Sequence, residues 1–263
     1  MSTLSVAVHD STTMTRRSLR RIVRYPSMTA ILVGMPVVFL LLFVYVFGES
    51  LGAGLGLGHI GRAGYADYVT PGILLITVAS AAQGTAISVA LDMNAGLIAR
   101  FRTMPVTRSA VLVGHAVSSF LQTMLSIAVV LAVALAVGFR PTAGLSGWIA
   151  ASGVVALFTV ALTWLSVAFG LVAKTPESAS NLPMFLVLLP FLSSGFVPTE
   201  SLPGPLRWVA ENEPFTPTIE TIRGLLLATP NARDLTLAIG WSIAIALGSY
   251  VWAQRLFDRR PTR

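Results

Sequence analysis

Long apolar stretches without a charged side chain dominate the sequence, and shorter polar segments separate them. Six of these stretches contain no Asp, Glu, Lys or Arg: residues 27–48, 68–91, 109–139, 147–173, 178–199 and 235–254. Each is about as long as the ~20 residues that a helix needs to cross the hydrocarbon core of a bilayer. The pattern therefore predicts an all-α integral membrane protein with six transmembrane helices.

The charged segments divide the chain into three parts. We expect a cytoplasmic arm over residues 1–26, a transmembrane domain over 27–254 and a basic cytoplasmic tail over 255–263. The predicted spans cover residues 27–48, 69–91, 110–138, 148–173, 179–197 and 235–254. Because these spans use most of the 263 residues, we expect any energy-converting domain to be another chain.

Composition excludes several other classes of protein. With 54% hydrophobic and 11% charged residues, the chain is unlike soluble domains, which are about 25% charged. The absence of cysteine excludes disulfides, thiolate metal sites and cysteine nucleophiles. The net charge of +7 would suggest nucleic-acid binding in a soluble protein, so the positions of the charges matter.

The basic residues are distributed unequally between the two sides of the predicted membrane domain. Thirteen of them lie on the side of the N-terminus: Arg16, Arg17, Arg20, Arg21, Arg24, Arg100, Arg102, Arg108, Lys174, Arg255, Arg259, Arg260 and Arg263. Five lie on the other side: Arg62, Arg140, Arg207, Arg223 and Arg233. Positive charge concentrates in cytoplasmic loops, so both termini are predicted in the cytoplasm and no nucleic-acid partner is expected.

Two segments on the cytoplasmic side have the pattern of amphipathic helices. In the N-terminal arm, Arg17, Arg20, Arg21 and Arg24 fall on one face, opposite an apolar face, and Pro26 ends the helix. In residues 92–108, apolar positions 97, 98, 101 and 104 have helical spacing, and Pro105 stops the element. Spacing alone leaves two interpretations open for each segment: a helix that rests on the inner leaflet, or one that takes part in function.

The outer connection between the fifth and sixth predicted spans is too apolar for a free loop and too short to span. Residues 218–227 are predicted to be helical, with Thr216 as the N-cap and Pro217 at the first helical position. We expect this connection to lie at the outer interface or to dip into it. Pro36, Pro183 and Pro190 fall inside predicted spans, where they kink or locally break a helix.

No motif in the chain indicates catalysis. Lys174 is the only lysine, and Ala173 precedes it, so a phosphate-binding P-loop is absent. None of the predicted spans contains a carboxylate, the group that ion-coupled carriers commonly keep inside the bundle. His115 is interpreted as an interfacial histidine rather than a proton relay. An enzyme with its own active site, a bound metal and a bound cofactor are therefore not expected.

The order of these features resembles the permease subunits of type-2 ABC transporters, most closely the daunorubicin-resistance and doxorubicin-resistance permeases. The similarity covers nearly the whole chain, and its most specific piece is the cluster Arg100-Phe101-Arg102-x-x-Pro105. Further points of similarity are Arg24-Tyr25-Pro26, Phe47-Gly48, Tyr65 to Tyr68, Pro71-Gly72 and Leu202-Pro203-Gly204, followed by Asn212, Pro214 and Arg223. Gly114-His115 departs from the family, in which Gly-Arg is frequent.

The resemblance implies three functional elements around the six spans. The connecting helix would contain Arg17, Arg20, Arg21 and Arg24. The coupling helix, which docks the ATPase, would contain Gly96, Arg100, Phe101, Arg102, Met104, Pro105 and Arg108. An outer re-entrant helical element would contain Pro203, Gly204, Asn212, Pro214 and Arg223.

The resemblance also implies the function and the partners. The chain would be the permease subunit of an ATP-driven exporter in the inner membrane of a prokaryote, moving an amphipathic drug or antibiotic. ATP and Mg²⁺ would bind a separate ABC ATPase subunit, and a second permease subunit would complete a homodimer or heterodimer within membrane lipid. Three alternatives stay open: export of a lipid or lipid-linked glycan, an ion-coupled secondary carrier, and a membrane scaffold or enzyme anchor without transport.

The charge asymmetry generates a topology prediction. Because the chain is naturally free of cysteine, single cysteines can be introduced without a background. Cysteines at Ala99 and Thr175 should be shielded from an impermeant thiol reagent in intact cells, whereas cysteines at Ala53 and Thr199 should react. Reaction of the cysteine at position 99 from outside would show that the orientation is wrong.

Overall fold

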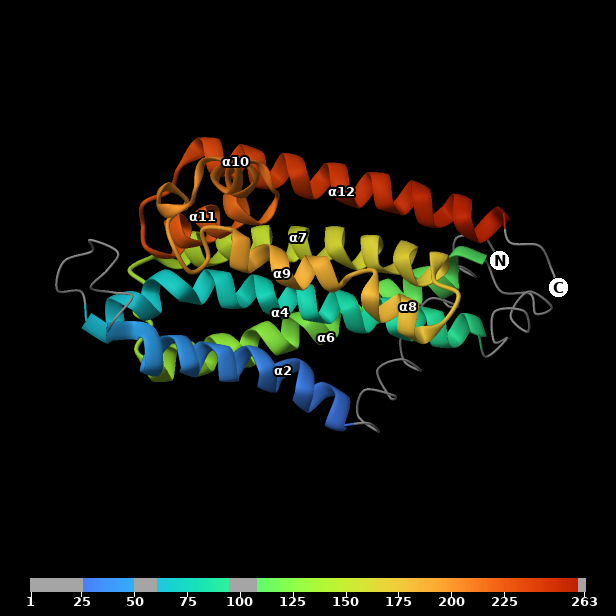
Figure 1. Cartoon of the computed structure of the whole chain (residues 1–263), viewed down its shortest axis with the longest axis horizontal. Helices are drawn as coiled ribbons and strands as arrows, with labels where there is room; N and C mark the ends of the chain where they lie inside the picture. The colour runs from blue at the N-terminus through green and yellow to red at the C-terminus, as the bar shows by residue number, and fades with distance from the viewer. Residues whose placement is uncertain (1–25, 50–60, 95–107, 260–263) are drawn as a thin grey trace.

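The computed structural model describes residues 26–49, 61–94 and 108–259 (Figure 1). Every regular element in these ranges is helical, which confirms the all-α class. Four helices are long and apolar enough to cross a membrane: α4 (Gly61–Asn94), α6 (Arg108–Val137), α7 (Leu145–Val172) and α12 (Ala232–Arg259). The first predicted span folds as the shorter helix α2 (Pro26–Leu41), continued by the π-helical turn η1 (Leu42–Phe47).

The fifth predicted span folds as two short helices, α8 (Pro176–Asn181) and α9 (Met184–Leu192). The break falls at Leu182 and Pro183, because proline lacks a backbone N–H and its ring clashes with the preceding turn. The sequence prediction of a proline-induced break at Pro183 is therefore confirmed, whereas Pro190 stays within α9. Whether α8 and α9 together cross the membrane stays a prediction.

Three further helices follow in the outer connection. They are η2 (Thr199–Ser201), α10 (Gly204–Asn212) and α11 (Phe215–Leu226). These helices lie at one end of the bundle, which we call the outer end, and α8 and the C-terminal end of α12 lie toward the opposite, inner end (Figure 1). Segments that the sequence predicts on opposite sides of the membrane are thus at opposite ends of the protein.

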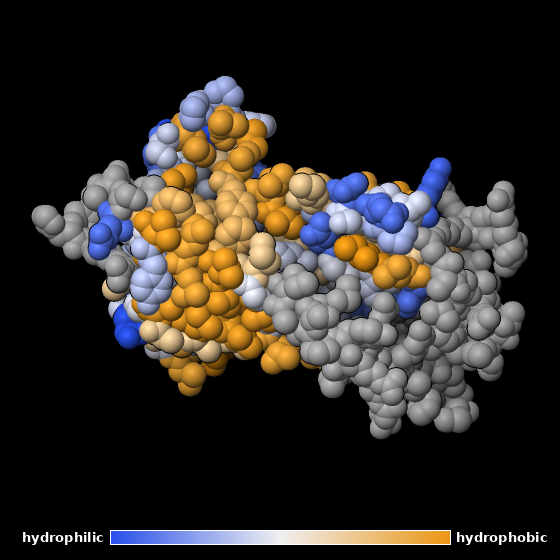
Figure 2. Space-filling model, turned by 60° about the horizontal axis from the view of Figure 1, so that its bottom comes forward, coloured by the Kyte–Doolittle hydropathy of each residue, from blue (hydrophilic) through white to orange (hydrophobic). Residues whose placement is uncertain are grey.

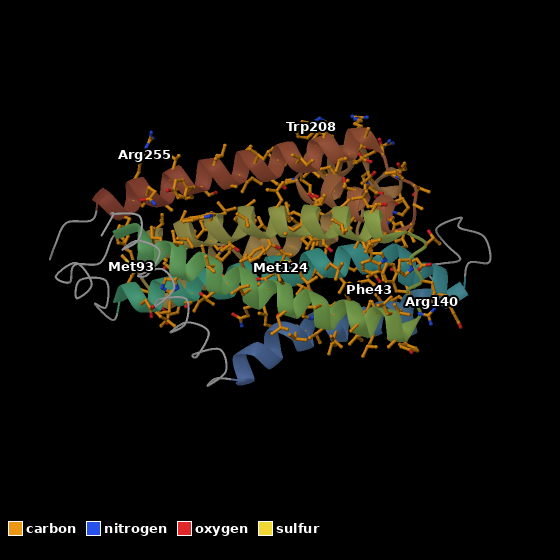
Figure 3. All side chains as sticks on the ribbon, turned by 180° about the vertical axis from the view of Figure 1, so that it is seen from behind. Phe43, Met93, Met124, Arg140, Trp208 and Arg255 are labelled. Carbon is orange, nitrogen blue, oxygen red and sulfur yellow. The ribbon has the colours of Figure 1, made fainter. Side chains whose placement is uncertain are left out.

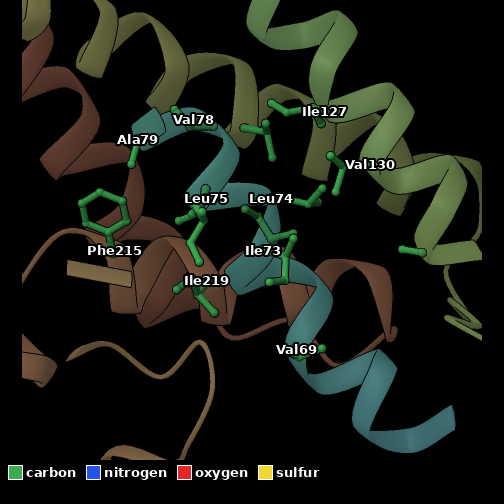
Figure 4. Packing of buried hydrophobic residues seen from close by; sticks show 14 of the residues in the cluster. Val69, Ile73, Leu74, Leu75, Val78, Ala79, Ile127, Val130, Phe215 and Ile219 are labelled. Atoms are coloured by element: carbon green, nitrogen blue, oxygen red, sulfur yellow. The ribbon is translucent and has the colours of Figure 1, made fainter. Parts of the chain in front are cut away.

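Helix α4 lies at the centre of the bundle. It packs against α2, α6, α7, α8, α9 and α11, and 72% of its most apolar stretch of 18 residues is buried. On one side, Ile73 and Leu74 of α4 are grouped with Ile127 and Val130 of α6, and on another side lie residues of α11 (Figure 4). Helix α4 is therefore enclosed by other helices over most of its length.

The helices at the periphery leave apolar faces exposed. In the most apolar stretch of 18 residues of each helix, only 28% is buried in α6 and 17% in α12. Leu125 on α6 and Leu247 on α12 are about 60% exposed, and Val46 in η1 is 65% exposed. Figure 2 shows such hydrophobic side chains covering much of one face of the molecule. A soluble monomer rarely exposes so large an apolar surface, so these faces are suited to contact with lipid or with another membrane subunit.

Glycine permits two close approaches of α4 to its neighbours. A Cβ atom added to Gly72 would lie 2.8 Å from the Cα atom of Gly195, in the segment that follows α9. At the inner half of α4, a Cβ atom on Gly170 of α7 would lie 2.6 Å from the carbonyl oxygen of Ala86. Small residues let helix backbones approach closely in a membrane, where burial in protein gives little gain over burial in lipid.

The glycines of α4 generate a stability prediction with an internal control. Gly72→Ala should destabilise the protein by about 1–3 kcal/mol, because the added methyl group overpacks the contact with the Gly195 backbone. Gly84→Ala, in the same helix but with open space around it, should stabilise by up to about 1 kcal/mol through helix propensity. Thermal unfolding in detergent measures both changes. Equal midpoints for the two variants would contradict the close approach.

Candidate functional site

The structure describes one of the three predicted functional elements, the outer one. The connecting-helix residues Arg17, Arg20, Arg21 and Arg24 lie outside the described residues, as do Gly96, Arg100, Phe101, Arg102, Met104 and Pro105 of the coupling segment. Arg108 is the first residue of α6. The geometry that follows is therefore that of α10, α11 and the residues that hold them.

Helix α10 lies at the surface of the outer end. Pro203 is its N-cap and Gly204 its first residue. Trp208 is 68% exposed, and Figure 3 shows it at the outer end of the molecule, on the side of α12. Arg207 and Glu211 form an exposed ion pair one turn apart, at 2.6 Å, and the Asn212 side chain donates to the Trp208 carbonyl at 2.8 Å. The polar groups of α10 are thus satisfied within the helix.

A buried carboxylate starts helix α11. The Glu213 side chain accepts hydrogen bonds from the backbone N–H groups of Phe215 (2.9 Å) and Thr216 (2.7 Å) and from the Thr216 hydroxyl (3.1 Å). It satisfies donors at a helix N-terminus, where negative charge is favoured. The prediction that Thr216 is the N-cap and Pro217 the first helical residue is wrong: the N-cap is Pro214, because Glu213 supplies the capping oxygen atoms.

Arg223 of α11 connects three parts of the outer end. Its Nη2 atom donates to the carbonyl oxygens of Ser194, after α9, at 2.8 Å and of Tyr68, in α4, at 3.0 Å. Its Nε atom also points to the Tyr68 carbonyl, at 3.3 Å, and its Nη1 atom forms an ion pair with Glu220. The guanidinium lies over the Tyr68 ring, with the Cζ atom 4.0 Å from the ring centroid.

Arginine suits this position better than lysine would. The guanidinium is planar, carries five N–H donors in a fixed arrangement and stacks on aromatic rings. Only 11% of the Arg223 side chain is exposed, so its hydrogen bonds form where the solvent competes little. A lysine would supply one compact charge, which cannot hold Tyr68 and Ser194 in the same planar arrangement. Arg223 therefore fixes α11 against α4 and the segment after α9.

The C-terminal end of α11 is held by the loop between α6 and α7. The backbone N–H groups of Thr142 and Ala143 both donate to the Leu226 carbonyl, at 3.1 Å. A Cβ atom on Gly147 of α7 would lie 2.7 Å from the Leu225 carbonyl oxygen, so α7 and α11 also approach closely. Helix α11 is thus fixed at both ends by hydrogen bonds and close backbone contact, and Thr218, Ile219 and Ile222 in its middle are fully buried.

The residues predicted in the outer element fall into two groups. Arg223 reaches Tyr68, a contact that the sequence did not predict, and Pro214 caps α11. Pro203, Gly204 and Asn212 shape α10 instead.

Sequence reasoning did not single out Glu213 or Ser194. The only signal for Glu213 is an acidic residue directly before a proline-rich helix start, and Ser194 acts through its carbonyl oxygen, which no residue type reveals.

The charged side chains of the outer element position its helices. Among the described residues, no group of three or more His, Cys, Asp and Glu side chains could hold a metal ion. The two buried charges, Glu213 and Arg223, bind backbone groups of neighbouring elements. Burial raises the pKa of Glu213 to about 7, and the hydrogen bonds from Phe215 and Thr216 partly oppose this rise.

Comparisons with known proteins agree with this architecture. A model of the ABC-2 type transporter family matches residues 10–227. A daunorubicin resistance ABC transporter permease protein of Streptomyces coeruleorubidus is 28% identical over 237 residues, which is 89% of this chain and 81% of the relative. A probable doxorubicin resistance ABC transporter permease protein of Mycobacterium tuberculosis is 23% identical over 176 residues, 66% of this chain and 64% of the relative.

The raised pKa of Glu213 generates a prediction about pH. Folding favours the neutral carboxyl, so this group's contribution to stability is complete below its usual pKa of 4.5 and is lost as pH rises through about 7. The loss amounts to about 3 kcal/mol at most. Glu213→Gln should remove this pH dependence, because the amide oxygen still accepts a hydrogen bond but does not titrate.

Thermal unfolding at pH 5 and pH 8.5 measures the effect. The difference between the two midpoints should shrink in Glu213→Gln and persist in the control Glu211→Gln, whose side chain is 42% exposed on α10. An undiminished difference in Glu213→Gln would show that this carboxyl does not titrate in the range.

Proposed function

We propose a transport function on one premise: this chain belongs to the ABC-2 type transporter family. It acts as the transmembrane permease subunit of an ATP-driven ABC exporter, and an ABC ATPase subunit is its partner. The observation that carries the proposal is the family match over residues 10–227, which extends from the N-terminal arm through the outer element. The apolar helices that the structure describes support it, because they supply the membrane domain that such a subunit needs.

The cargo that we propose is an amphipathic drug or antibiotic. The proposal rests on relatives whose names refer to resistance to daunorubicin and doxorubicin. A lipid or a lipid-linked glycan is the alternative within the same class of exporter, since the apolar exterior of the bundle suits either kind of molecule.

The proposed complex contains two permease subunits and two ATPase subunits. Each permease has six spans and both termini in the cytoplasm, with α8 and α9 as the fifth span. ATP and Mg²⁺ bind the ATPase subunits, and this chain binds neither. The predicted coupling segment, residues 92–108, docks the ATPase, and the predicted N-terminal connecting helix rests on the inner leaflet. Closure of the ATPase subunits then displaces a packed helix, which moves the attached spans as a rigid body.

The outer element has a matching role in this proposal. Because Arg223 and Gly195 hold α11 and the segment after α9 against α4, a displacement of α4 is carried to the outer end. Helix α4 runs from the outer element to the predicted coupling segment, since residues 95–107 follow its inner end. An ion-coupled secondary carrier is the rival from another class, and it predicts that a gradient alone drives transport.

Reconstitution tests the proposed function against this rival. In vesicles that contain this chain and an ABC ATPase subunit that co-purifies with it, efflux of doxorubicin should require ATP and should persist when a protonophore collapses the proton gradient. Replacing the catalytic carboxylate of the ATPase should stop efflux. Efflux from vesicles that contain this chain alone, driven by an imposed pH gradient, would show that the chain is a secondary carrier.

The docking role of residues 92–108 makes a separate prediction. Arg100→Glu, Phe101→Ala and Arg102→Glu combined should leave membrane insertion intact and reduce co-purification of the ATPase about tenfold or more, as loss of central interface residues does. The matched control is Arg207→Glu on α10, at the opposite end of the bundle, which should not affect co-purification. Normal assembly of the triple variant would mean that the segment only rests on lipid.

A further inference from the structure

The contact between α4 and α6 changes character along its length. Toward the outer end it is apolar, with Ile73 and Val78 of α4 grouped with Ile127 and Val130 of α6 (Figure 4). Toward the inner end polar contacts join the apolar packing, which continues there with Val89 of α4 and Leu112 of α6. There the hydroxyls of Thr85 and Ser119 form a hydrogen bond between the two helices.

The last polar contact of this seam joins Asp92, in the last turn of α4, to His115 of α6. The Asp92 Oδ2 and His115 Nε2 atoms are 3.2 Å apart, and the side chains are 15% and 11% exposed. This pairing was not predicted from the sequence, which placed Asp92 at the start of the amphipathic segment 92–108 and interpreted His115 as an interfacial histidine. Hydrogen bonds that involve a charged partner gain strength where water is scarce.

The inner half of α4 is also fixed to two other elements. Gln83 donates from its side chain to the Ser180 carbonyl of α8, at 2.9 Å. Gly170 of α7 approaches the Ala86 carbonyl so closely that a methyl group would not fit. Helix α4 therefore has a defined position at its inner half. There α6 meets it through the Asp92–His115 and Thr85–Ser119 pairs and through Val89 of α4 and Leu112 of α6, which are buried in one hydrophobic cluster.

We propose that Asp92 and His115 are a positioning pair that keeps α4 and α6 in one register at the ends of the predicted coupling segment. The inference rests on the proposed function, because residues 95–107 join these two helices. With the pair in place, a displacement of the segment moves both spans together. Without it, the two helix ends separate and the displacement is absorbed locally.

The surroundings of the pair favour positioning over proton transfer. A proton relay needs a succession of titratable groups through the membrane. Between His115 and Arg140, α6 contains no titratable side chain, and between Tyr68 and Asp92, α4 contains none. Further along the seam lie two hydroxyls and then aliphatic side chains. The pair lies at the inner end of both helices, and no titratable side chain continues from it along α4 or α6 through the membrane.

The test is a double-mutant cycle on the reconstituted complex, read by the stimulation of ATP hydrolysis that the permease gives to its ATPase. Asp92→Ala and His115→Ala should each lower the stimulation about 3- to 10-fold, the range of typical coupling energies. The double variant should be no worse than either single variant, because the two residues act as one unit. The exchange Asp92→His with His115→Asp should restore at least half of the stimulation.

Two controls separate positioning from a general loss of stability. Ser118→Ala removes hydroxyl bonds to Gly114 and His115 carbonyls within α6 and should keep the stimulation. Thermal unfolding of the permease alone tests the pair without a partner, and the same non-additivity should appear there. If the wild-type complex shows no stimulation, the proposed function fails while this second cycle still decides the pairing.

Three results would overturn the proposal. They are stimulation that survives in both alanine variants, additive effects of the two changes in both assays, and a failure of the exchanged pair to restore stimulation when it folds as stably as the wild type. A protonophore-sensitive efflux that is lost in His115→Ala would show instead that the pair carries protons.

Discussion

The close packing of α4 against six other helices is the constraint on which the rest of the structure depends. In a bilayer, apolar helices gain little by leaving lipid for protein, so close backbone contact and hydrogen bonds must hold the bundle together. Helix α4 provides both. Its backbone meets the segment after α9 at Gly72 and α7 at Ala86, and its polar side chains bind α6 and α8. The peripheral helices α6 and α12 can then leave apolar faces to lipid.

Because of this packing, the same helix, α4, makes contacts at both the outer and the inner end. Helix α4 has 34 residues, which corresponds to a length of about 50 Å. Near its outer end the Tyr68 carbonyl accepts from Arg223, and at its inner end Asp92 contacts His115. These two contacts pair α4 with Arg223 of α11 and with His115 of α6, so they specify where α11 and α6 lie. The aliphatic middle of α4 supplies packing without such specificity.

Several features of the fold could be predicted from the sequence because local chemistry decides them. Charge-free runs predicted the long helices, and the missing N–H of Pro183 predicted the break between α8 and α9. Helix α4 begins at Gly61, ahead of the second predicted span, which starts at residue 69. Asp67 is tolerated inside the helix because it lies near the outer end and accepts from the Arg140 backbone N–H at 2.7 Å.

The contacts that define the candidate site could not be predicted in the same way. Arg223 and Tyr68 are 155 residues apart, and the bond uses a carbonyl oxygen that every residue type carries. The start of α11 was misplaced because the Thr-Pro pair at 216–217 matches the usual helix-start pattern, while the actual cap is the side chain of Glu213. Asp92 and His115 become partners only through the register of two helices.

A distance measurement between spin labels tests the central claim most directly, namely that α4 carries displacement to the outer end as a rigid body. Labels on Gly84→Cys in α4 and Thr229→Cys after α11 lie at exposed positions of this cysteine-free chain. In the complex with its ATPase, the distance between them should be the same with and without bound ATP, while the distance between the Gly84→Cys labels of two copies changes. A change within one chain as large as that between copies would contradict the account.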